Sequence, residues 1–207
     1  MRRPCLAGVN GSHYRDIVLV SDLRHFLDMP DDAPGPAQRL GVQLAAIVRA
    51  ASSRPAGSGA RSAIGCSRRR GHRPCAGFVM VFRRSIGEIA WSCDAYGDKG
   101  VIRGWEGSPA DVSGLDDSDA EGDMVALLIV PDLFDVLREA LLLDAACELL
   151  VARAEGSADG VVLTGRTGAF AQLVEFVASE VNAETDGRRV RLLDMGRIAL
   201  EAALAAE

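Results

Sequence analysis

Three short segments with many apolar residues lie in the middle of the chain, at 78–83, 88–93 and 100–105, and in the second of them apolar residues alternate with polar or small ones. These segments are rich in aromatic and β-branched residues, and only turn-sized gaps separate them. The pattern predicts an antiparallel, three-stranded meander. In the middle strand, the alternation places Trp91 and Cys93 on the same face of the sheet.

A helix is predicted before the meander, beginning at Pro36, because proline suits the first turn of a helix. Apolar residues recur there at helical spacing, namely Leu40, Leu44, Ile47, Val48 and Ala51. The next segment, residues 52–63, is mostly small, polar and rich in glycine. Such a composition predicts a flexible connection.

The second half of the chain opens with an apolar run, residues 124–130, that predicts a strand, and Pro131 begins a predicted helix. Two interpretations are open for the residues beyond the first turns of this helix. Either the helix continues towards Arg153, or residues 149–154 pair with residues 161–164 as a hairpin. The hairpin is favoured because its loop ends in Asp-Gly, which is a strong turn signal.

Two further helices are predicted by apolar residues at helical spacing, one from Phe170 to Val181 and one from Val190 to Leu204. The order of elements in this half is then β-α-β-β-α-α, which predicts helices on one face of a sheet. The chain as a whole is therefore predicted to be α+β. A small, zinc-ribbon-like meander with an N-terminal helix precedes the β-α-β-β-α-α module.

Charge is distributed unevenly, which favours two modules over one. Residues 1–107 hold 16 lysines and arginines against 9 acidic residues, whereas residues 108–207 hold 7 against 20. We expect a loose N-terminus at 1–16, a helix plus ribbon-like module at 17–106, an acidic linker at 107–123 and an acidic α+β module at 124–207.

The composition is that of an ordinary globular protein, since 48% of the residues are hydrophobic and 25% are charged. No apolar run approaches the roughly 20 residues needed to cross a bilayer, so no membrane partner is expected. The N-terminus carries two arginines but lacks the apolar stretch of a signal peptide. Five cysteines, an odd number, argue against a disulfide framework. We therefore expect a cytoplasmic protein whose thiols are reduced or bind metal.

Three cysteines carry most of the chemical information: Cys66 and Cys75, with eight residues between them, and Cys93 at the end of a predicted strand. The sequence from Cys93 matches a C-x-x-C-G zinc knuckle, except that Tyr96 stands in place of the second cysteine. Structural zinc takes four thiolate or imidazole ligands in a tetrahedron. Because His72 lies between the first two cysteines, it is the candidate fourth ligand. We therefore expect Cys66, His72, Cys75 and Cys93 to form a site for one structural zinc ion.

Two other interpretations of the cysteines stay open. The ribbon could have lost its metal, with Tyr96 packed where the missing ligand would lie. The thiols could instead have a redox role, although three converging thiols suit a ligand set better than a redox pair.

The pattern around the cysteines extends further along the chain, as C-x8-C, an apolar strand and then W-x-C-x-x-C-G-D-x-G-V-I-x-G-W. Its matching residues are Cys66, Cys75, Cys93, Gly97, Asp98, Gly100, Val101, Ile102, Gly104 and Trp105. The pattern resembles that of a family of uncharacterised bacterial proteins with a small zinc-ribbon-like segment. The similarity covers most of residues 17–207, and Tyr96 departs from it. Membership implies a ribbon-like metal site and leaves the activity open.

Arginines near the cysteines make a candidate nucleic-acid-binding surface, because arginine contacts phosphates and nearby aromatic side chains can stack on bases. The candidate residues are Arg68, Arg69, Arg70, Arg73, Arg83 and Arg84. Two alternatives compete with this hypothesis. The segment could be a solvated loop, since arginine is favoured throughout this composition, or it could contact the acidic second half.

No catalytic motif surrounds any of the three histidines. The first hypothesis is therefore a non-enzymatic binding or adaptor protein whose partner is a protein or a nucleic acid. The alternative is a metal-dependent or nucleic-acid-processing enzyme, in which the cysteines and His72 would hold an ion beside an open cleft. A third hypothesis is an oligomerising structural protein whose C-terminal helices pair between chains. The sequence leaves the oligomeric state open.

Overall fold

The computed structural model describes residues 18–30, 32–70, 72–85, 87–118, 120–139 and 143–205, without the side chains of residues 18 and 70. The predicted loose N-terminus, residues 1–16, lies outside the described residues. In chain order the elements are β1 (Val18–Asp22), α1 (Arg24–Leu27), α2 (Gly35–Ser52), β2 (Gly59–Gly65), β3 (Arg69–Arg70), β4 (Arg73–Pro74), β5 (Phe78–Arg83), β6 (Ile89–Cys93), β7 (Lys99–Arg103), β8 (Met124–Ile129), α3 (Pro131–Glu139), α4 (Ala145–Ala152), β9 (Glu155–Gly156), β10 (Val161–Arg166), α5 (Thr167–Ala183) and α6 (Gly187–Ala205). The chain is α+β, as the sequence predicts. No helix in the described ranges is long and apolar enough to cross a membrane.

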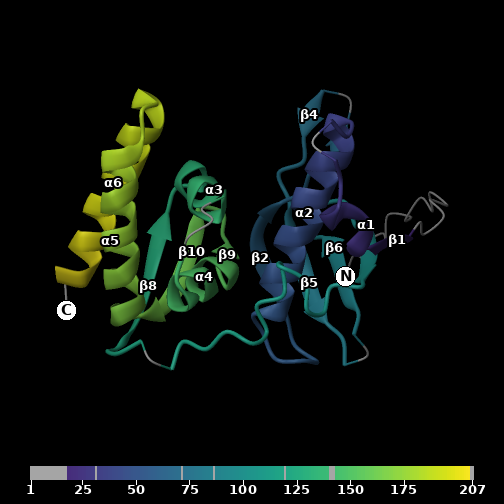
Figure 1. Ribbon diagram of the computed structural model, residues 1–207, viewed down its shortest axis with the longest axis horizontal. Coiled ribbons are helices and arrows are strands. Elements are labelled where there is room, and N and C mark those ends of the chain that lie inside the picture. Colours follow the sequence, from purple (N-terminus) through teal and green to yellow (C-terminus); the bar gives the residue numbers. More distant parts are fainter. Residues whose placement is uncertain are drawn as a thin grey trace, which may run out of the picture.

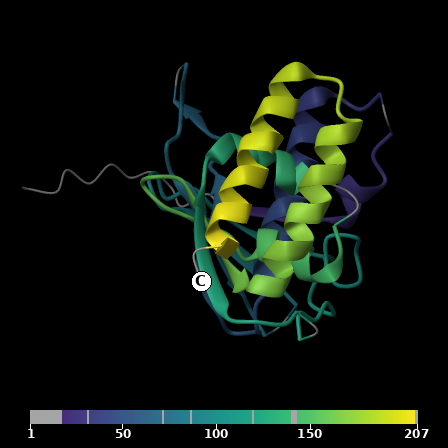
Figure 2. The same cartoon turned by 90° about the vertical axis from the view of Figure 1, so that its left-hand side faces the viewer.

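One mixed sheet runs through both halves of the chain, with the strand order β1-β7-β6-β5-β2-β9-β10-β8. The pair β1–β7 is parallel, whereas the other neighbouring strands are antiparallel. The strands β3 and β4 form a separate small hairpin. Figure 1 shows α2 beside the strands of the first half and α5 and α6 beside those of the second. Figure 2, turned by 90°, shows these helices gathered on one side of the sheet.

The predicted meander is confirmed as β5, β6 and β7, with Val79 opposite Cys93 in the register. Successive side chains of each strand point to opposite faces of the sheet. Val79 and Val81 are buried in the core that α2 covers, whereas Met80 and Phe82 are 36% and 43% exposed. Because Met80 and Phe82 are apolar as well, the sequence of β5 does not by itself distinguish its buried face from its exposed face.

The prediction of a flexible connection at residues 52–63 is wrong in part, because the central strand β2 begins within this segment. This strand pairs with β5 on one side and with β9 on the other. Ser62 and Ala63 are buried, and the Ser62 hydroxyl donates a hydrogen bond to the Val79 carbonyl oxygen at 2.7 Å. Small residues are needed here, since a Cβ atom on Gly59 would lie 2.8 Å from the Val81 carbonyl oxygen. Tertiary pairing, rather than local composition, decides this conformation.

The prediction of a strand at residues 149–154 is also wrong, because the helix α4 continues through Ala152. The side chain of Asp144 caps this helix by accepting a hydrogen bond from the Cys147 amide at 2.8 Å. The hairpin begins only at β9, and its predicted turn is present, with the Ser157 amide donating to the Gly160 carbonyl at 2.8 Å. The second half therefore has the order β-α-α-β-β-α-α.

Two hydrophobic cores lie under the sheet and meet at β2, where Ala63 belongs to one core and Ile64 to the other. The predicted acidic linker, 107–123, has no helix or strand in its described residues but packs against the first half. Val112 is buried, and its amide donates to the Ser52 hydroxyl at 3.1 Å. The division of the chain into modules stays a prediction.

Candidate metal centre

Cys66 and Cys75 are brought together by the chain reversal that contains the β3–β4 hairpin. The Cys66 amide donates to the Gly77 carbonyl at 2.8 Å, and the Cys75 amide donates to the Arg68 carbonyl at 2.9 Å. These two hydrogen bonds align the segments that lead into and out of the hairpin. Both cysteines therefore lie at the base of the hairpin.

Cys93 comes to the same place from the end of β6. Its amide donates to the Asp98 carbonyl at 2.7 Å, and its carbonyl accepts a hydrogen bond from the Gly97 amide at 3.0 Å. Gly97 has a φ of 69°, a left-handed conformation that glycine adopts without strain. The tight turn after Cys93 is thus the predicted knuckle, with Tyr96 at its second ligand position.

The sulfur atoms of Cys66, Cys75 and Cys93 all lie within 4.8 Å of one another, so the three residues could hold a metal ion. The Cys75 and Cys93 sulfurs are 3.6 Å apart. Two thiolates on one tetrahedral zinc ion, each bonded at about 2.3 Å, would lie about 3.8 Å apart. The observed spacing therefore fits a shared mononuclear ion and exceeds a disulfide bond.

Each of the three sulfurs also accepts backbone amide hydrogen bonds from residues close after it in the chain. The Gly77 amide donates to the Cys75 sulfur at 3.2 Å. The Arg68 amide donates to Cys66, and the Ala95 and Tyr96 amides donate to Cys93. Such donors stabilise a thiolate, which is the form that binds metal.

The acidity of the thiols depends on burial set against these hydrogen bonds. Burial raises the pKa of Cys66 to about 11, with further increases from Cys93 and Cys75, although the Arg68 amide acts in the opposite direction. Burial also acts to raise the pKa of Cys93. The amides of Tyr96 and Ala95, together with the neighbouring thiols, outweigh it and leave the pKa of Cys93 below its usual value. Of these two thiols, Cys93 is therefore the one that ionises more readily.

Gly77, which was not among the predicted site residues, allows the hairpin and the knuckle to approach closely. A Cβ atom at this position would lie 2.6 Å from both the Ala95 Cβ and the Asp94 carboxylate, and 3.0 Å from the Cys93 sulfur. Any larger residue would push the two sides of the site apart. The signal that could have identified it is a glycine two residues after Cys75, where its amide can reach the sulfur.

Two carboxylates beside the cluster are held by arginines rather than directed at the sulfurs. Asp94 accepts a hydrogen bond from Arg61 Nε at 2.8 Å and another from the Phe78 amide at 2.9 Å. Asp98 forms an ion pair with Arg68. These interactions leave the thiols as the ligands that converge.

The predicted fourth ligand, His72, is not brought to the cluster. It lies exposed in the turn between β3 and β4, and it is not part of the group formed by the three cysteines. Tyr96 lies after Cys93 in the knuckle and is 48% exposed. Of the four predicted ligand residues, the described part of the chain therefore brings three together.

The six predicted nucleic-acid-binding arginines are divided between two places. Arg69 and Arg73 are exposed on the hairpin, close in sequence to the cysteines. Arg83 lies at the far end of β5, where it donates to the Ser52 and Arg54 carbonyls at 3.2 and 2.9 Å. It also stacks over Trp105, at 5.3 Å from the ring centroid.

Of the remaining candidates, Arg84 forms an ion pair with Glu88, Arg68 binds Asp98, and the side chain of Arg70 lies outside the described part of the chain. The five candidate arginines with described side chains therefore do not form one surface.

The fold and the site together define an α+β protein with a three-thiol site that could bind metal. Comparisons with family profiles, with curated proteins and with solved structures each found no match to this chain. The resemblance to a family of ribbon-bearing bacterial proteins therefore stays a prediction.

Proposed function

We propose that this chain is a non-enzymatic binding protein in which Cys66, Cys75 and Cys93 hold one structural zinc ion. The observation that carries the proposal is the convergence of three sulfurs that each accept backbone amide hydrogen bonds. Thiolates and a tetrahedral arrangement select zinc among the divalent ions. A reducing compartment such as the cytoplasm would keep the thiols available as ligands.

The zinc ion would brace the β3–β4 hairpin against the sheet. The strands β3 and β4 have two residues each, and so short a hairpin is marginal on its own. Zinc bound to Cys66 and Cys75 at its base, and to Cys93 at the end of β6, would join the hairpin to the sheet. Metal binding would then contribute directly to folding.

A structural role fits the surroundings of the site better than a catalytic role. Catalytic zinc needs an open coordination position and a general base beside it. Three protein thiolates with a water molecule as the fourth ligand would leave the open position that a catalytic site has, so the general base decides between the two roles. The carboxylates of Asp94 and Asp98, which could serve as a base, are engaged by Arg61 and Arg68.

The partner that we propose for the braced hairpin is a nucleic acid. Arg69, His72 and Arg73 are exposed on the hairpin, where they can reach a phosphate backbone. Arginine gains affinity for nucleic acids from phosphate contacts and the release of counterions. A rigid hairpin presents these charges with a smaller loss of conformational entropy on binding.

Protein purified without chelator is expected to contain about one zinc ion per chain, because the three thiolates form a single site. The substitution Cys75→Ser should reduce the zinc content to near zero, since it removes a ligand at the base of the hairpin. Elemental analysis of the purified proteins measures both quantities.

The matched control for this experiment is Cys147→Ser, because Cys147 is a buried thiol in the other core. It should retain its zinc. In the opposite direction, Tyr96→Cys adds a fourth thiolate at the second knuckle position and should raise the zinc affinity at least about tenfold. A wild-type protein that contains stoichiometric iron, or no metal, would contradict the proposal.

The nucleic-acid proposal predicts that binding to a labelled single-stranded oligonucleotide weakens steeply between about 50 and 200 mM salt. Replacing Arg69 and Arg73 together with glutamine should lower the slope of log affinity against log salt by about 1.4. Fluorescence anisotropy across a salt series measures this slope.

The matched control replaces two arginines of α6, Arg188 and Arg191, with glutamine and should leave the slope unchanged. Binding that does not depend on salt, or that both double variants reduce equally, would exclude the hairpin as the contact surface.

A further inference from the structure

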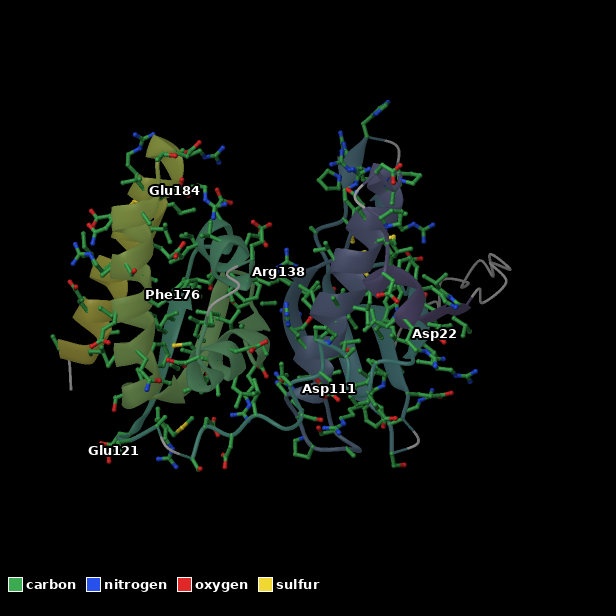
Figure 3. All side chains as sticks on the ribbon, viewed as in Figure 1. Asp22, Asp111, Glu121, Arg138, Phe176 and Glu184 are labelled. Carbon is green, nitrogen blue, oxygen red and sulfur yellow. The ribbon has the colours of Figure 1, made fainter. Side chains whose placement is uncertain are left out.

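A cavity of about 240 Å³ lies between the two halves of the molecule, away from the cysteines. Its walls come from α2 and β2 on one side and from α3 and α4 on the other. Figure 3 shows Arg138 of α3 in the space between the halves. The cavity therefore lies where a bound molecule would contact both halves.

Most of the cavity wall is apolar, but three charged side chains also line it: Arg49, Arg138 and Glu148. Glu148 offsets Arg49, since its carboxylate lies 3.3 Å from Arg49 Nε. Arg138 forms an ion pair with Asp135 at 3.1 Å, but Asp135 is not part of the cavity wall. The charges that line the cavity therefore sum to +1.

Both arginines keep an unused donor in this region. The Nε atoms of Arg49 and Arg138 are buried, and neither has a hydrogen-bond partner among the described residues. The ion pair of Arg49 with Glu148 lacks the alignment of a hydrogen bond. A buried N–H group without an acceptor is costly, but these two Nε atoms lie below the accessible surface, so a ligand would contact the outer guanidinium nitrogens.

The size of the cavity limits what can bind there. Pockets for drug-sized ligands measure roughly 300–1,000 Å³, so this cavity suits a smaller molecule, on the order of ten non-hydrogen atoms. Ala50, Ile64, Phe134, Leu137 and Val151 give it an apolar wall. A ligand with a compact apolar body would therefore fit beside the charged groups.

We propose that this cavity binds a small organic carboxylate, with its apolar body against the α2, α3 and α4 side chains and its carboxylate at Arg49 and Arg138. A carboxylate has two acceptor oxygens and forms strong, charge-assisted hydrogen bonds with guanidinium groups. A cationic ligand would meet two arginines and one glutamate. The net positive charge of the wall thus selects an anion.

Benzoate is a suitable probe, and benzamide is its uncharged isostere. Calorimetry on the full chain is expected to give saturable benzoate binding with a dissociation constant of about 1 mM or tighter. Benzamide should bind at least about tenfold more weakly, because it lacks the charge that pairs with the arginines. Equal affinity for the two compounds, or no saturable binding of benzoate, would overturn the proposal.

Three variants test the assignment of the site. Arg138→Gln should weaken benzoate binding about tenfold, whereas Glu148→Gln should strengthen it, since a like charge is removed. Ala152→Leu should fill the cavity and abolish binding. The control Arg197→Gln, on α6, should change nothing. If Arg138→Gln leaves the affinity unchanged while the protein stays folded, the carboxylate does not bind here.

Discussion

Removing zinc from the protein with a chelator is expected to accelerate tryptic cleavage after Arg68 and Arg69 by about a hundredfold. The short strands β3 and β4 cannot hold the hairpin closed by their own hydrogen bonds. A ligand at one hundred times its dissociation constant stabilises the closed form by about 2.7 kcal/mol, which corresponds to this change in rate. Cleavage of the native protein reports the population of the locally open form. Timed digestion with detection by mass spectrometry measures the rate at each site.

Cleavage after Arg188 provides the internal control. The Arg188 side chain is 84% exposed at the start of α6, distant in sequence from the cysteines, so its cleavage rate should not change. Returning zinc should restore protection of the hairpin, and Cys93→Ser should remove that rescue. If cleavage after Arg188 accelerates equally, the chelator has destabilised the whole chain, and the hairpin is not the element that zinc braces.

The substitution Phe170→Ala is expected to lower the free energy of unfolding by about 3–5 kcal/mol. Phe170 is 1% exposed and lies in the core of the second half, together with Leu163 and Leu173, which are fully buried. Truncating the ring leaves a cavity that these rigid neighbours cannot fill. Urea unfolding monitored by circular dichroism measures the loss.

Phe82→Ala is the matched control, because Phe82 is 43% exposed on the face of the sheet away from α2. At this position the same substitution should lower the free energy of unfolding by no more than about 0.5 kcal/mol. A loss at Phe82 as large as that at Phe170 would mean that the exposed face of the sheet is covered in solution.

The meander and most helices could be predicted because their local pattern agrees with their packing. The strand β5 is a short apolar run bounded by turn residues, and Leu44 and Ile47 repeat at helical spacing on the buried side of α2. A single sequence is enough to predict such elements, because the spacing of their buried residues follows from the geometry of the helix or strand itself. The boundaries near Ala152 were missed because a run of buried apolar residues fits a helix and a strand equally well.

The central strand β2 could not be predicted from its own residues. Its small residues suit a linker in composition, and they are ordered by partners that lie far away in sequence. Arg61 pairs with Met80 in the sheet, and Ser62 pairs with Glu155. Only the assembled sheet provides these partners, so propensity gives no signal here.

The cysteine cluster was predictable from spacing, but its surroundings were not. The pairing of Arg69 with Pro74 leaves His72 in the turn, where it is exposed. Arg83 is close to the cysteines in sequence, but the strand β5 carries it roughly 17 Å from Phe78. Grouping arginines by their closeness in sequence therefore predicted a larger arginine surface than the structure has.

The parallel pair β1–β7 determines the order in which the chain can close its cores during synthesis. Val18 pairs with Lys99, and the Leu23 amide donates to the Arg103 carbonyl at 2.9 Å. The N-terminal half therefore cannot complete its sheet until residue 103 has left the ribosome, although α2 can already pack on β2, β5 and β6 before that point. The C-terminal half pairs β8 with β10 and α5 with α6 over much shorter stretches of chain. Although it is translated last, this half has the topology that closes fastest.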